Sequence, residues 1–164
     1  MNTKLLRDRE IATDDWQTLE AGTQLPDSGK LIVELGHWQE LGAPASTEAR
    51  AIGVQLPNTE DVEALWPSIC ALPLIALSFP LYSDGRAYSQ ARLLRDRLGF
   101  RGQLRATGEV IRDQVLEMHR CGFNEIVPRA DQSLDDCVRA FKDFSLAYQG
   151  AADGQPSIFR RRFG

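Results

Sequence analysis

The sequence predicts a single α/β domain with a mostly parallel open sheet of about five strand–helix units. Short apolar runs alternate with segments of helical spacing along most of the chain, and this alternation is typical of parallel βα units. The chain has 164 residues, of which 43% are hydrophobic, enough to bury one core. Because a complete eight-unit barrel needs about 250 residues, a partial β/α barrel is the alternative.

We expect residues 1–150 to form this domain, with an irregular segment over residues 1–30. The turn signal Pro26–Gly29 in that segment allows a small hairpin. Residues 151–164 form a C-terminal tail that contains Arg160–Arg162 between two phenylalanines. This tail is either a frayed end or a docking peptide for an acidic partner.

Five apolar runs predict the strands. Leu74–Phe79 is continuously apolar and is followed by Pro80, as expected of a central strand that is buried on both faces. The expected strands cover residues 31–35, 51–56, 74–79, 103–106 and 125–127.

Apolar residues at helical spacing predict four helices between and after these strands. In residues 86–98 the apolar side chains share one face, and Gly99 ends the helix. Pro67 should kink or restart the helix after the second strand. The other helices are expected to start near Asn58–Asp61, at Gly108 and after Ser133, which provides an N-cap.

The carboxyl ends of parallel strands meet at one rim, where ligands of such folds bind. This rule selects three loops, and each carries or adjoins an arginine. Two of the loops lead into helix N-termini, whose free N–H groups favour anions. We therefore expect a small oxyanion or a phosphorylated ligand there. The candidate ligand-binding residues are Ser83, Asp84, Gly85, Arg86, Tyr88, Ser89, Arg105, Thr107, Glu109, Asp113 and Arg129.

A structural interpretation of the same loops stays open beside this one. Asp84, Glu109 and Asp131 lie in the three selected segments. The arginines would then pair with these carboxylates and hold the loops in place, without binding any ligand.

No motif in the sequence names a catalytic residue, a metal site or a cofactor. The three cysteines, Cys70, Cys121 and Cys137, are widely spaced, and no two of them form a CxxC motif. We therefore expect reduced thiols rather than disulfides. Cys121 falls at the end of a predicted helix, where the helix dipole disfavours a thiolate, which favours a structural role. His37 and His119 are far apart and form no metal-ligand pattern. Glycine-rich nucleotide-binding motifs and a hydrolase nucleophile motif are absent.

Charge and hydropathy exclude two classes of partner. The formal net charge is −4, so no strong overall field attracts nucleic acid or acidic lipid. The N-terminus lacks the apolar core of a signal peptide, and no apolar run approaches the roughly 20 residues that span a bilayer. A cytoplasmic location is expected.

Four segments resemble a bacterial family of uncharacterised proteins whose members are described as oxidoreductases involved in sulfite reduction. The resemblance is specific over about residues 78–127 and weaker from Trp16 to the helix near Phe141. It rests on Phe79–Arg95, Gly102–Ala106, Arg112–Gln114 and Arg120–Phe123.

The resemblance implies a role in assimilatory sulfur metabolism beside a sulfite reductase, and it implies no particular cofactor. Two hypotheses follow. In one, the chain is a small enzyme or an anion-handling component that binds a sulfur oxyanion at the rim. In the other, it is a non-catalytic accessory subunit that docks on sulfite reductase or on its electron donor through Arg92, Arg95 and the basic tail.

Overall fold

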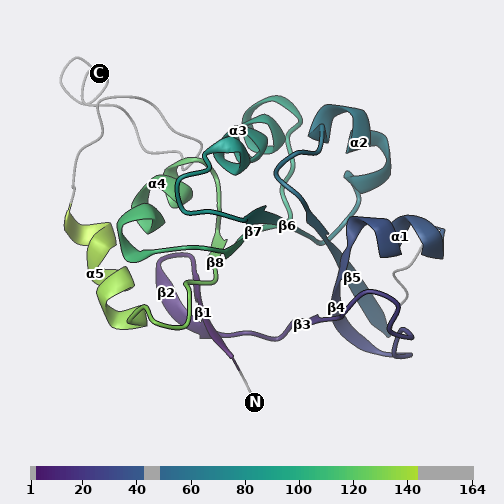
Figure 1. Ribbon diagram of the computed structural model, residues 1–164, viewed down its shortest axis with the longest axis horizontal. Coiled ribbons are helices and arrows are strands. Elements are labelled where there is room, and N and C mark those ends of the chain that lie inside the picture. The colour runs from purple at the N-terminus through teal and green to yellow at the C-terminus, as the bar shows by residue number, and fades with distance from the viewer. Residues whose placement is uncertain (1–2, 43–48, 144–164) are drawn as a thin grey trace.

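The computed structural model describes residues 3–42 and 49–143, in which helices cover one face of a curled eight-stranded sheet (Figure 1). The expected tail with its three arginines lies outside the described residues. The strands are β1 Lys4–Arg7, β2 Glu10–Thr13, β3 Gln17–Thr18, β4 Gly29–Glu34, β5 Arg50–Leu56, β6 Leu74–Phe79, β7 Gln103–Gly108 and β8 Glu125–Ile126. The helices are α1 Leu35–Leu41, α2 Val62–Ile69, α3 Arg86–Arg92, α4 Val115–Arg120 and α5 Leu134–Asp143.

The sheet has the order β2-β1-β8-β7-β6-β5-β4-β3, and it is mixed. Strands β3 to β8 are parallel, whereas β1 is antiparallel to both of its neighbours, β2 and β8. The expectation of about five parallel units was therefore too simple. The three additional strands, β1 to β3, all come from the first 18 residues, which the sequence presented as irregular.

The N-terminal hairpin explains this difference. A two-residue turn joins β1 to β2, and its residues Asp8 and Arg9 have positive φ angles of 49° and 74°. Such turns usually carry glycine or asparagine, because other residues rarely adopt this conformation. The pair Asp8–Arg9 therefore gave no hairpin signal, and the expected turn at Pro26–Gly29 instead leads into β4.

The sheet must curl strongly, because a short connection joins its two edges. Strands β2 and β3 lie at opposite edges, yet only Asp14, Asp15 and Trp16 separate them in the chain. Seven strand spacings in a flat sheet would place the edges about 34 Å apart, whereas this connection can reach only about 14 Å. The sheet is therefore a half-barrel, in agreement with the partial barrel considered from the sequence. We call residues 14–16 the crossing segment.

The two faces of the half-barrel are packed differently. The main hydrophobic core lies on the outer face, between the sheet and the helices, and includes the fully buried Leu77, Phe79 and Leu104. Among the described residues, the inner face carries a smaller apolar cluster of Trp16, Ile32, Leu74 and Ala76. This face also carries charged and polar side chains, among them Arg105, Glu125 and Gln55.

Most helix boundaries agree with the sequence signals. Asp61 caps α2 by accepting a hydrogen bond from the N–H of Glu63 at 2.9 Å, and Ser133 caps α5 by accepting one from Asp136 at 3.3 Å. Pro67 does not restart the helix, since α2 runs without a break from Val62 to Ile69 and ends two residues after the proline. Helix α1 was not expected, because Gly36 in its first turn weakens the helical pattern.

The helix expected at Gly108 begins later. Strand β7 continues to Gly108, and α4 starts at Val115 after a 3₁₀ turn. Gly108 has a φ of 97°, and a Cβ atom there would lie 2.4 Å from the carbonyl oxygen of Phe79. The glycine therefore allows a close backbone contact rather than a helix start. None of the helices in residues 3–42 and 49–143 has the length and apolarity to cross a membrane.

Candidate functional site

A buried arginine stands at the centre of the inner face. Arg105 on β7 is only 2% exposed, and it lies beside Glu125 on β8, which is fully buried. The Nε of Arg105 donates a hydrogen bond to Glu125 at 2.8 Å, and the Nε of Arg7 on β1 donates to the other oxygen of Glu125 at 2.7 Å. A carboxylate between two arginines compensates charges that would be costly to bury alone.

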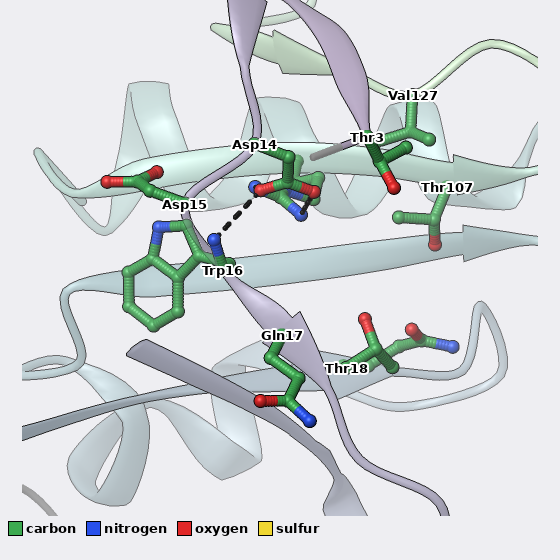
Figure 2. Close-up of a pocket in the computed structure, with 10 residues that line it drawn as sticks. Thr3, Asp14, Asp15, Trp16, Gln17, Thr18, Thr107 and Val127 are labelled. Atoms are coloured by element: carbon green, nitrogen blue, oxygen red, sulfur yellow. Dashed lines mark hydrogen bonds and ion pairs between the residues drawn. The ribbon is translucent and has the colours of Figure 1, made fainter. Parts of the chain in front are cut away.

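The crossing segment supplies the second partner of Arg105. The two terminal nitrogens of Arg105 donate to the two oxygens of Asp14 at 2.9 and 2.7 Å. One of these oxygens also accepts a hydrogen bond from the N–H of Trp16 at 3.0 Å, as Figure 2 shows. Asp14 and Glu125 together therefore bind all three guanidinium nitrogens.

Asp15 extends the charge network towards solvent. Its carboxylate pairs with Lys30 and with Arg7, the latter at 2.9 Å. The hydrogen bond from Lys30, together with that from Arg7, lowers the pKa of Asp15 from 3.8 to about 2. Within this network, the three carboxylates of Asp14, Asp15 and Glu125 thus pair with three cations, Arg7, Lys30 and Arg105.

Trp16 lies between this charge network and the apolar residues of the inner face. Its indole N–H donates to the side chain of Gln103 at 2.9 Å, and its ring packs against Ile32, Leu74 and Ala76. A buried indole whose N–H has a partner is a stable wall for a cavity.

A polar cavity of about 750 Å³ lies beside Trp16, which forms one of its walls. In the view of Figure 2, Thr3, Thr18 and Thr107 gather on one side of Asp14, and the Trp16 ring lies on the other. A volume of this size accommodates a small organic or inorganic ligand. The lining residues are Thr3, Asp14, Asp15, Trp16, Gln17, Thr18, Gln55, Arg105, Thr107 and Val127.

The cavity lies towards the carboxyl ends of the parallel strands. Gln55, Ala76 and Arg105 are cross-strand neighbours in one row of the sheet, and the small Ala76 leaves room between the two longer side chains. Thr107 follows Arg105 on the same face, one step closer to the rim. The side chains of Thr107, Thr18 and Gln55 form no hydrogen bond within the described part of the chain, so they are available to a ligand.

The loop after β6 does not contribute to this cavity. The Arg86 guanidinium donates to Asp84 at 2.6 Å and is 59% exposed, and it lowers the pKa of Asp84 well below its usual range. Ser83, Gly85 and the side chain of Ser89 in α3 are also exposed. This arginine therefore has the carboxylate partner that the structural interpretation expected.

The other two rim loops show the same pattern. Arg129 binds Glu109 at 2.8 Å and Asp131 at 2.7 Å, and the pKa of Asp131 falls to about 2 beside it. Asp113 is exposed, and in the part of the chain that the structure describes it pairs with its neighbour Arg112. The rim loops meet one another, since the side chain of Gln114 donates to the carbonyl of Tyr82 at 2.6 Å, but their arginines are engaged.

Tyr88 and Cys121 belong to the core between helices and sheet. The Tyr88 ring packs edge-on against Phe79, with the ring centres 5.1 Å apart. Burial, reinforced by Cys121 and Glu117, raises the pKa of Tyr88 to about 12. Burial also raises the pKa of the Cys121 thiol, although Arg92 opposes this shift. These groups remain protonated at neutral pH, in agreement with a structural Cys121.

Of the candidate residues, Arg105 and Thr107 line the cavity and the other nine do not. The sequence interpretation missed Asp14, Gln55 and Glu125. One sequence signal could have found Glu125. A charged residue in the middle of a buried strand needs an opposite charge, and both Arg105 and Glu125 occupy such positions.

Among residues 3–42 and 49–143, no group of three histidine, cysteine or acidic side chains could hold a metal ion.

The fold and the cavity define a class: a small α/β half-barrel protein with an arginine-containing polar cavity at its mouth. A family model matches residues 53–159, and the chain belongs to this family, described as "Bacterial protein of unknown function (DUF934)". The match includes Gln55, Arg105 and Thr107, whereas Asp14 precedes it. Comparisons with curated proteins and with solved structures found no match.

Proposed function

We propose that this protein binds a small sulfur oxyanion or a phosphorylated ligand in the half-barrel cavity, as a component of assimilatory sulfite reduction. The observation that carries the ligand class is the buried Arg105, whose terminal nitrogens face a cavity with unpaired polar side chains. The guanidinium group binds oxyanions through two parallel hydrogen bonds. The pathway is supported only by the resemblance of residues 78–127 to proteins of sulfite reduction.

The remaining contacts suit an oxyanion. The hydroxyl groups of Thr18 and Thr107 and the amide of Gln55 are neutral donors that line the same cavity as Arg105. Neutral donors around one cation bind an anion without creating an excess of positive charge. The rim arginines Arg86 and Arg129 are less suitable, because they are 59% and 40% exposed and water competes with a ligand for them.

Isothermal titration calorimetry tests the ligand class directly. We expect sulfite, sulfate or phosphate to bind the wild-type protein, and Thr107→Val, which removes one hydroxyl without changing size, to weaken that binding about fivefold or more. Thr23→Val is the matched control, since Thr23 lies in an exposed turn outside the cavity. Absence of binding, or equal binding by both variants, would contradict the proposed site.

A genetic experiment tests the pathway. A bacterium that lacks the gene for this chain should grow on sulfide but poorly on sulfite as its sulfur source. Equal growth on both would contradict a role in sulfite reduction.

An absorption spectrum and metal analysis of the purified protein test redox activity. A bound flavin, haem or iron–sulfur cluster would establish redox chemistry.

Docking on sulfite reductase or on its electron donor is a second candidate function. Leu81 and Tyr82 favour it, because these adjacent side chains on the rim are each 60% exposed. Arg95 is not a docking residue, since its guanidinium donates to the carbonyls of Phe100, Gly102 and Gly122. Replacing Leu81 and Tyr82 with serine should abolish co-purification with sulfite reductase, whereas the exposed-residue control Ile11→Ser should not.

A further inference from the structure

The two carboxylates that bind Arg105 differ in how they are held. Glu125 lies on a central strand, is fully buried and also binds Arg7. Asp14 lies on the crossing segment between the two edges of the sheet, and its side chain is 11% exposed. Glu125 therefore fixes the orientation of the guanidinium group, while Asp14 covers its cavity-facing side.

Asp14 occupies the position that an oxyanion would take. Its two oxygens receive parallel hydrogen bonds from the two terminal nitrogens of Arg105, at 2.7 and 2.9 Å. Sulfite, sulfate and phosphate bind arginine through the same paired geometry. As long as Asp14 stays in place, it occupies one N–H group on each terminal nitrogen of Arg105, and a two-oxygen ligand can take this pair only by displacing Asp14.

We propose that Asp14 is a built-in competitor for Arg105, which an incoming oxyanion displaces. This inference rests on the proposed function of the cavity. The exchange is noncovalent: the ligand takes over two hydrogen bonds from Asp14, and Glu125 keeps the guanidinium group in place. The displaced carboxylate turns towards the solvent side of the cavity.

Displacement has two consequences that can be measured. A ligand must offer two oxygens to replace the Asp14 carboxylate, so chloride is a poor competitor. The change also reaches Trp16, because its backbone N–H donates to Asp14 and this bond breaks when Asp14 leaves. Ligand binding thereby alters the crossing segment that joins β2 to β3.

Charge-matched variants test the competition. Asp14→Asn should bind sulfite or phosphate about tenfold or more tightly than the wild type, because it removes the anionic competitor. Asp15→Asn makes the same charge change one residue away, but Asp15 pairs with Arg7 and Lys30 and not with Arg105. It should tighten binding about threefold or less, which measures the general electrostatic effect. Equal gains in both variants, or weaker binding by Asp14→Asn, would overturn the inference.

The wild-type protein provides a readout that does not depend on how the variants fold. In an NMR titration with sulfite, the backbone amide of Trp16 and the Nε of Arg105 should shift together, with the Trp16 amide losing its hydrogen bond. Binding detected by calorimetry without a change at Trp16 would overturn the displacement but leave the proposed function intact. Absence of sulfite, sulfate and phosphate binding in the wild type and in Asp14→Asn would overturn both.

Discussion

The protein contains two groups of arginine–carboxylate pairs. Their N–O distances are similar, but the side chains in the two groups are buried to different extents. The inner-face network comprises Arg7, Asp14, Arg105 and Glu125, with N–O distances of 2.7 to 2.9 Å. The rim pairs of Arg86 and of Arg129 have similar distances of 2.6 to 2.8 Å. Arg105 is 2% exposed, whereas the two rim arginines are 59% and 40% exposed.

This difference decides what each group can do. Water replaces a lost partner at the rim, so a rim pair contributes little to stability and offers little to a ligand. Inside the half-barrel, a charge that loses its partner stays buried and uncompensated, which is costly unless another ligand takes that place. Distance alone therefore does not identify the functional arginine, and burial beside a cavity does.

The largest expected effect comes from removing the central carboxylate. Glu125→Gln leaves both Arg7 and Arg105 without their shared counter-charge, and we expect the free energy of unfolding to fall by about 3 to 5 kcal/mol. Urea denaturation measures this loss. Glu109→Gln makes the same change in a rim pair and should leave the urea midpoint nearly unchanged. Equal losses would show that burial does not separate the two groups.

An intermediate effect is expected from acid, through Asp15. The folded-state pKa of Asp15 is about 2, below its ordinary value of 3.8. The resulting stabilisation is therefore complete above about pH 4 and is lost as the pH falls towards 2. The pair is partly exposed, so we expect the loss to be below about 1 kcal/mol.

Unfolding measured between pH 5 and pH 2 tests this expectation. Asp15→Asn should show a flatter decline than the wild type, because the variant has no carboxylate to protonate at this position. An equally steep decline would mean that Asp15 does not contribute.

The smallest effect is expected at the rim. Arg129→Ala removes the ion pairs with Glu109 and Asp131, but water solvates the two carboxylates. The urea midpoint should stay within experimental error, while hydrogen exchange becomes faster in residues 108–114 and 128–133. A fall in the midpoint as large as that of Glu125→Gln would contradict the comparison.

Much of the parallel sheet could be predicted from the sequence, because its signals are local. The run Leu74–Phe79 coincides with β6, and the strands near residues 51–56 and 103–106 were found within about two residues. Ser133 caps the helix that it was expected to start, and the cap of α2 is Asp61, the last residue of the expected start at Asn58–Asp61. The three rim loops also meet, since parallel connections place them at one end of the sheet.

The inner-face network could not be predicted in the same way, because its contacts are distant in the chain. Asp14 and Arg105 are 91 residues apart, and they meet only because the sheet curls until the crossing segment covers its mouth. The curl depends on a hairpin turn at Asp8–Arg9 that carries no usual turn residue. The sequence could indicate that Arg105 needs a carboxylate, but not that Asp14 supplies one.

A crystal structure with selenite tests the central claim most directly. Selenite is a pyramidal analogue of sulfite, and selenium scatters X-rays anomalously, so one map locates the anion among all arginines. We expect a single strong peak in the cavity, within hydrogen-bonding distance of the two terminal nitrogens of Arg105, with Asp14 displaced. A peak beside Arg86 or Arg129 with an empty cavity would contradict this assignment of the functional arginine.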